Sequence, residues 1–148
     1  MVAERFQENV LNLQPLHHFE QALLKSHEKE VFHGLIAAFK ESGYESNGYF
    51  RQEVAGRMLL VCFPQPDMEL SEILTISASN YNFSVEQFPF YLALTFGRNF
   101  FRSIVKDCLE RPEFSDKEKK SLETYLYWTR PTEEKIREEV EHNRNAIH

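Results

Sequence analysis

The sequence is poor in glycine and in cysteine. It has 5 glycines and 2 cysteines among its 148 residues. So few glycines leave little material for the tight turns of small all-β folds, and they make a phosphate cradle of backbone N–H groups hard to build. Both cysteines, Cys62 and Cys108, lie in apolar runs. We therefore expect two buried, reduced thiols and no disulfide.

Common catalytic and targeting signatures are also missing. The chain has no G-x-x-x-x-G-K-[ST] phosphate loop, no G-x-G-x-x-G fingerprint, no H-E-x-x-H zinc helix, no C-x-x-C pair and no G-x-S-x-G elbow. These absences argue against nucleotide-dependent enzymes and α/β-hydrolases. No stretch approaches the roughly 18 apolar residues of a membrane span, and the first residues lack the apolar core of a signal peptide. We therefore expect a cytosolic (cytoplasmic) protein with no membrane partner and no cofactor.

Basic residues are outnumbered by acidic ones, and the net charge is −6. A protein that binds duplex nucleic acid usually carries a basic face, so nucleic acid is not an expected partner. An acidic surface favours the capture of a basic protein instead. With 42% hydrophobic and 27% charged residues, the composition is that of a globular chain. Its length predicts one domain over residues 1–148 that needs neither disulfide nor metal to fold.

Apolar residues recur at helical spacing along most of the chain. This periodicity predicts an all-α, single-domain bundle of about eight or nine short helices. The stripes of the first half consist of Val2, Phe6, Val10 and Leu13, then Leu16, Phe19 and Leu23, then Val31, Phe32, Leu35, Ile36 and Phe39, and then Phe50, Val54, Met58 and Val61.

Several boundaries follow from these stripes and from the residues between them. The second and third stripes would lie on nearly opposite sides of one continuous helix, so we expect a break near Ser26, which would cap the new helix. Gly43 and residues 46–48 predict a turn. Periodicity alone does not distinguish helix from strand for residues 58–63, and the lack of a partner strand favours helix.

The second half carries clear helix-start signals. Asp67 is a candidate N-cap for a helix that carries Leu70, Ile73, Leu74 and Tyr81. A long helix is expected to begin at Pro89 and to continue through Gly97 to Arg111. Ser115 and Glu118 have capping-box spacing, and Thr132 is placed to cap a last helix with a thin apolar seam of Ile136, Val140 and Ile147. Such a seam suggests peripheral docking or a surface available to a partner.

The segment of residues 88–102 contains six aromatic residues. Because they follow the core face of a helix, we interpret them as core and not as a base-stacking platform. The face we expect to be apolar consists of Phe96, Phe100, Phe101, Ile104, Val105, Cys108 and Leu109. Arg98, Arg102 and Lys106 form a basic ridge beside it, for which a solvated face is favoured over an anion site.

Two E-x-x-H pairs keep an enzyme hypothesis open. Glu30 with His33 and Glu139 with His142 have the i, i+3 spacing that places a carboxylate and an imidazole on one helix face. In helical bundles, two such pairs bind a di-iron or di-manganese centre together with glutamates from two other helices. Those would be Glu53 and Glu72 here. The chain is rich in glutamate, however, so such pairs also arise by chance, and solvated helix faces are favoured.

An acidic cluster lies near the C-terminus, and it is our candidate protein-binding site. Its members are Glu133, Glu134, Glu138, Glu139 and Glu141. Basic residues among them suit i, i+4 pairing on a solvated face, which is the commoner role of such runs.

The segment of residues 84–97, "SVEQFPFYLALTFG", has an acidic residue before a Pro-aromatic-Tyr-Leu run that a Phe-Gly pair closes. The residues of this pattern are Glu86, Pro89, Phe90, Tyr91, Leu92, Phe96 and Gly97. It resembles a turn and helix found in small uncharacterised bacterial helical proteins, some of them immunity-type proteins that neutralise a toxin. The pattern often has Trp where this chain has Phe90, and it carries no functional residue across.

Together these features predict a non-enzymatic protein-binding module whose partner is another, basic protein. The resemblance implies a more specific function, that of an immunity-type protein that neutralises a basic toxin. The alternatives are a metal-carboxylate helical enzyme that uses the two E-x-x-H pairs, and a structural or oligomerisation domain.

Overall fold

The computed structural model describes residues 14–40 and 46–147, with side chains described for residues 25–40 and 50–143. Within these ranges the chain forms seven helices and no strands, which confirms the all-α prediction, although eight or nine helices were expected. The helices are α2 (Gln14–Ala37), α3 (Ser46–Cys62), α4 (Leu70–Ala78), α5 (Gln87–Phe96), α6 (Arg98–Leu109), α7 (Asp116–Trp128) and α8 (Glu133–Ile147). The expected stripe at residues 2–13 lies outside the described residues.

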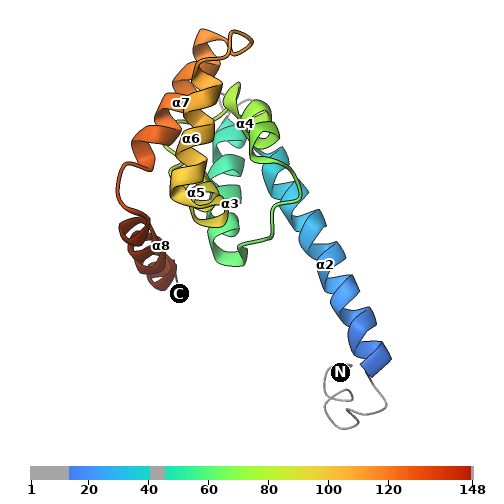
Figure 1. Ribbon diagram of the computed structural model, residues 1–148. Coiled ribbons are helices and arrows are strands. Elements are labelled where there is room, and N and C mark those ends of the chain that lie inside the picture. Colours follow the sequence, from blue (N-terminus) through green and yellow to red (C-terminus); the bar gives the residue numbers. More distant parts are fainter. Residues whose placement is uncertain (1–13, 41–45, 148) are drawn as a thin grey trace.

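Helix α5 lies at the centre of the bundle. It packs against α3, α6, α7 and α8, while α4 packs against α6 and α7. Helix α2 contacts α3 on the opposite side from α8 (Figure 1). The aromatic residues Phe88, Phe90 and Tyr91 of α5 are buried, as is Phe101 of α6, so these members of the aromatic segment are core. Phe100 differs, since its side chain is 52% exposed.

Helix α2 is continuous through Ser26, so the expected break is wrong. Phe32 and Ile36 of its C-terminal half, and Phe39 just beyond it, are buried in the core. The N-terminal half extends away from the other helices (Figure 1). The two apolar stripes can therefore occupy opposite sides of one helix, because only one of them has to face the core.

Helix α3 begins at Ser46, so residues 46–48 are helical and not the expected turn, while Gly43 lies outside the described residues. Residues 58–62 are helix, as favoured. Phe63 follows with a positive φ of 43°, which ends the helix. Gly56 lies where α3 crosses the start of α5, because a Cβ at this position would lie 3.0 Å from the side chains of Val85 and Gln87.

Three boundaries in the second half differ from expectation. Helix α4 begins at Leu70 with Glu69, not Asp67, at the N-cap position, and Tyr81 lies beyond its end. Helix α5 begins two residues before Pro89. The long helix expected to run through Gly97 is two helices, because Gly97 has φ 91° and ψ 130°, a backbone conformation that interrupts a helix and favours glycine.

The capping predictions for the last two helices are confirmed. The Glu118 N–H donates to Ser115 Oγ at 3.1 Å, and the Ser115 N–H donates to the Glu118 carboxylate at 2.8 Å. At α8, the Lys135 N–H donates to Thr132 Oγ1 at 3.2 Å. Both cysteines are free thiols, but Cys62 is exposed and only Cys108 is buried. Among the described helices, none is sufficiently long and apolar to cross a membrane.

Candidate interaction surface

Helix α3 exposes a row of large apolar side chains. Phe50, Val54 and Met58 follow one another at i, i+4 spacing, and their side chains are 65%, 40% and 41% exposed. This row belongs to the stripe that predicted a helix here, and the helix is confirmed, but these three residues of the stripe are exposed. The face of α3 that packs into the core carries Ala55 and Leu59 instead.

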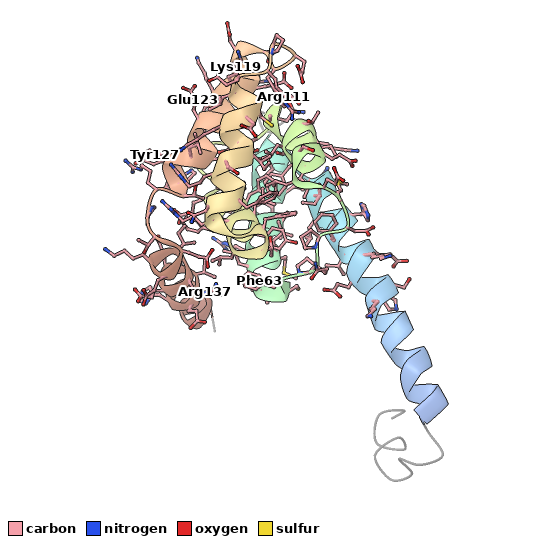
Figure 2. All side chains as sticks on the ribbon, in the orientation of Figure 1. Phe63, Arg111, Lys119, Glu123, Tyr127 and Arg137 are labelled. Carbon is pink, nitrogen blue, oxygen red and sulfur yellow. The ribbon has the colours of Figure 1, made fainter. Side chains whose placement is uncertain are left out.

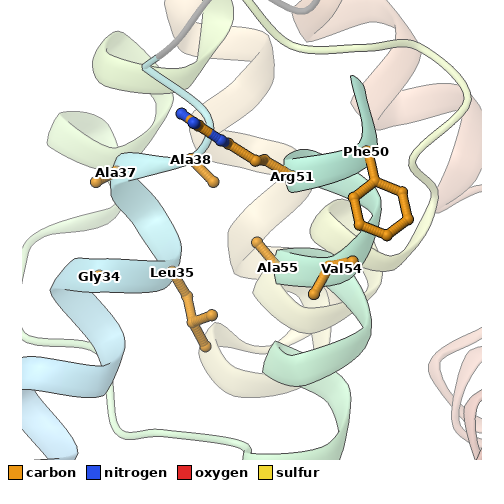
Figure 3. Close-up of a pocket in the computed structure, with 8 residues that line it drawn as sticks. All are labelled: Gly34, Leu35, Ala37, Ala38, Phe50, Arg51, Val54 and Ala55. Carbon is orange, nitrogen blue, oxygen red and sulfur yellow. The ribbon is translucent and has the colours of Figure 1, made fainter. Parts of the chain in front are cut away.

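Phe50 and Val54 of this row line a groove between α2 and α3. The groove has a volume of about 340 Å³. Its walls are formed by Gly34, Leu35, Ala37 and Ala38 from α2 and the turn after it, and by Phe50, Arg51, Val54 and Ala55 from α3 (Figure 3). Val31, one turn before Leu35 on α2, is a further exposed apolar residue. The groove is therefore apolar apart from one guanidinium.

Gly34 makes the α2 wall of the groove shallow. A Cβ at this position would have no heavy atom within 4 Å among the described residues. No packing within the described part of the chain therefore requires glycine here, although glycine in a helix interior costs roughly 1 kcal/mol relative to alanine. A glycine at this position would, however, allow a binding partner to approach the helix closely.

Sequence reasoning missed this surface because it assigned one apolar face to each helix. A signal was present in α3, since it has apolar residues on two sides. Besides Phe50, Val54 and Met58, it carries Ala55, Leu59 and Leu60, which are buried. A helix that is apolar on two sides is expected to have two packing partners.

The loop after α3 is held against α2 by polar contacts. The His33 imidazole and the Asp67 carboxylate are 2.8 Å apart, and the Gln65 N–H donates to the Glu28 carboxylate at 2.7 Å. The hydrogen bond from His33 lowers the pKa of Asp67, and desolvation partly opposes this effect. The charge of Lys29, 3.9 Å away, also lowers this pKa. These contacts fix the loop and do not border the groove.

The two E-x-x-H pairs are not brought together. Glu30 and His33 lie on α2, while Glu139 and His142 lie on α8, on the other side of the bundle (Figure 1). His33 pairs with Asp67, and Glu30 lies 3.8 Å from His27. In the described part of the chain, no group of three or more His, Cys, Asp or Glu side chains is placed to hold a metal ion.

The acidic cluster on α8 divides into one residue with a structural contact and four exposed ones. Ile136 and Val140 are buried, so the described part of the seam docks this helix on the bundle. Glu133 accepts a hydrogen bond of 2.9 Å from the Arg98 N–H at the start of α6. The exposed members are Glu134, Glu138, Glu139 and Glu141.

The charge of α8 affects the pKa of one neighbouring carboxyl group, that of Glu86. Burial raises the pKa of Glu86, and the charge of Glu139 raises it further. The acidic surface therefore reaches from α8 to the residue that precedes α5.

The basic ridge of α6 is not a solvated face at its first two members. Arg98 donates to the carbonyl oxygens of Thr129 and Arg130 at 3.0 and 2.8 Å. Arg102 donates to the Leu126 carbonyl at 2.7 Å and to Thr129 Oγ1 at 3.0 Å. These arginines satisfy carbonyl groups at the C-terminus of α7, where a helix leaves its acceptors unpaired. Burial, and secondarily Arg98, lowers the pKa of Arg102.

Comparisons with protein-family models, with curated proteins and with solved structures gave no match.

A second, aromatic surface lies along α7, with a hollow of about 450 Å³. Tyr127 and Glu123 lie on the outer side of this helix (Figure 2). The Arg130 guanidinium lies 3.9 Å from the centre of the Tyr127 ring, and the Trp128 indole N–H donates to the Phe83 carbonyl at 2.8 Å. The aromatic groups here contact one another and Arg130. Two charged residues, Lys120 and Glu123, also line this hollow, so it suits an apolar partner less well than the groove does.

Proposed function

We propose that this chain is a protein-binding module that acts without catalysis, and that the groove between α2 and α3 is its docking surface. One observation carries the proposal: the exposed side chains of Phe50 and Val54 line an apolar groove between two adjacent helices. Val31 on α2 and Met58 on α3 are further exposed apolar residues on the same two helices. Single exposed apolar residues are ordinary, whereas contiguous ones mark interaction sites.

The shape of the groove favours a helical partner. Two adjacent helices with an apolar channel between them suit an amphipathic helix, which inserts residues spaced by three and four positions. Phe50 has the size and the exposure of an anchor residue at such an interface.

A photo-crosslinking amino acid at position 50 tests the proposal in cells that express the protein. We expect a covalent protein adduct from position 50 and none from position 100. Phe100 is the matched control, because it is also a half-exposed phenylalanine but lies on α6, outside the groove. Equal yields of adduct at both positions, or none at either, would contradict the proposal.

The acidic surface of α8 supports a second candidate function, the neutralisation of a basic protein such as a toxin. The supporting observation is that Glu134, Glu138, Glu139 and Glu141 remain exposed although Ile136 and Val140 dock the helix. Association through this surface should weaken with added salt. A binding constant for a basic partner that stays the same between low and high salt would exclude it.

A further inference from the structure

We infer that the occupant of the groove is a second copy of this chain, in a two-fold dimer formed by antiparallel pairing of α2. The inference rests on the proposed function of the groove and names its partner. It follows from what lies at the two ends of α2: an apolar groove at one end, and at the other a helical half that projects from the other described helices (Figure 1).

In the described part of the chain, the N-terminal half of α2 has no neighbouring helix (Figure 1). It begins at Gln14 and extends away from the other helices (Figure 1). Helices shorter than about 12–15 residues are marginal in water, and most helices in proteins are stabilised by packing an apolar face. The sequence supplies such a face in this half, at positions 16, 19 and 23.

The apolar positions of this half and the groove lie on the same side of the helix. At 100° per residue, positions 16, 23 and 34 fall within roughly 20° of one another around α2. Positions 32 and 36, whose side chains face the core, lie nearly opposite. One side of α2 thus carries apolar or small residues in both halves, while the other side is buried near its C-terminal end.

Antiparallel pairing matches these two surfaces reciprocally. If the two-fold axis passes α2 near position 28, position 19 of one copy lies opposite position 37 of the other. Ala37 and Phe50 both line the groove. Each copy therefore contributes its projecting half to the groove of its partner, which is the self-complementary arrangement that a two-fold dimer requires.

Gly34 supports close approach of a second helix on this side. Among the described residues, no heavy atom lies within 4 Å of where a Cβ would stand, and small residues allow two helix backbones to approach. A partner helix lying across α2 would use this space.

Sedimentation velocity tests the inference on the full chain. The wild type should sediment at about twice its mass of 17.5 kDa at micromolar concentrations. Phe50→Glu in the groove and Phe19→Lys in the projecting half should each raise the dimer dissociation constant by at least about 30-fold, the equivalent of losing one strong anchor. Phe100→Glu is the control and should remain dimeric.

Mixing the two charged variants makes the test specific for the reciprocal contact. In a mixed dimer, Lys at position 19 of one copy meets Glu at position 50 of the other, and the second contact keeps both native phenylalanines. The equimolar mixture should recover the dimer mass that each variant alone has lost. Far-ultraviolet circular dichroism verifies folding, and Val54→Glu replaces Phe50→Glu should that variant unfold.

Three outcomes would overturn the inference: a monomeric wild type at 100 micromolar or more, a Phe50→Glu variant (or its Val54→Glu replacement) as dimeric as Phe100→Glu, or no recovery on mixing. A monomeric wild type that still forms adducts with a different protein from position 50 would overturn the dimer alone and leave the proposed function standing. A monomer without adducts would overturn both.

Discussion

The carboxylate of Glu133, the first residue of α8, accepts a hydrogen bond of 2.9 Å from the backbone N–H of Arg98, the first residue of α6. No side chain at the Gly97 N-cap fulfils this role, so a residue from another helix satisfies an N–H that would otherwise lack an acceptor. Glu133 is thus a structural member of the acidic cluster, in contrast to its exposed neighbour Glu134.

Replacing Glu133 should destabilise the fold, while replacing Glu134 should not. We expect Glu133→Ala to lower the free energy of unfolding by about 1 kcal/mol, the usual effect of losing a helix cap. Glu134→Ala, which removes the same charge from an exposed site, should stay within about 0.5 kcal/mol of wild type. Urea denaturation measures both values. Equal changes in the free energy of unfolding for the two variants would show that Glu133 has no structural role and belongs to the solvated face with Glu134.

Arg102 should matter more for stability than Lys106 on the same ridge. Its guanidinium bonds the Leu126 carbonyl and the buried Thr129 hydroxyl. Arg102→Ala should lower the free energy of unfolding by about 1–3 kcal/mol, because hydrogen bonds to a charged donor are lost and an acceptor is left buried. Lys106→Ala removes an exposed cation and should change it by less than about 0.5 kcal/mol. Urea unfolding measures both variants. Similar losses of unfolding free energy in Arg102→Ala and Lys106→Ala would show that the lost positive charge, and not the hydrogen bonds of Arg102, accounts for the destabilisation.

The contact between His33 and Asp67 should be lost in acid. Because the pKa of Asp67 is lowered in the folded protein by the His33 hydrogen bond, the contact stabilises the folded state above the ordinary aspartate pKa of about 3.9. This stabilisation disappears as the pH falls through the lowered value. An NMR titration of the Asp67 carboxyl should show a midpoint below the ordinary value, and His33→Gln should raise it.

Lys29 should keep part of the lowering in the His33→Gln variant, since its ammonium lies 3.9 Å from the Asp67 carboxylate. His142→Gln on α8 is the matched control and should leave the midpoint unchanged. A midpoint for Asp67 that is the same in wild type and in His33→Gln would contradict the hydrogen bond as its cause.

The hydroxyl groups of Ser77 and Tyr125 should be energetically coupled. They lie 2.7 Å apart in the core, and both residues are fully buried. Ser77→Ala should cost about 1–3 kcal/mol, because it leaves the Tyr125 hydroxyl buried without this partner. Tyr125→Phe and the Ser77→Ala/Tyr125→Phe double variant complete a double-mutant cycle. The losses of unfolding free energy in the two single variants should not add up to that of the double variant, and the difference should be about 0.5–3 kcal/mol. If the losses measured by urea unfolding were strictly additive, the hydrogen bond between the two hydroxyl groups would contribute nothing to stability.

Local signals in the sequence determined the class of fold and several helix ends. The capping box of Ser115 and Glu118 and the cap at Thr132 involve residues three positions apart, so spacing alone predicts them. The burial of Phe88, Phe90 and Tyr91 could also be predicted, because so many apolar residues at helical spacing have to face a core. A protein-binding function was predicted from charge and missing motifs, and it stays a prediction.

Tertiary structure decided which of several apolar faces is buried and which polar residues meet. Phe50 and Leu59 are equally suited to a core, but the crossing of α3 over α5 buries only Leu59. The pairs of His33 with Asp67 and of Arg98 with Glu133 join residues 34 and 35 positions apart. Contacts at such separations depend on how helices pack in space, whereas periodicity records only the surface that each helix offers.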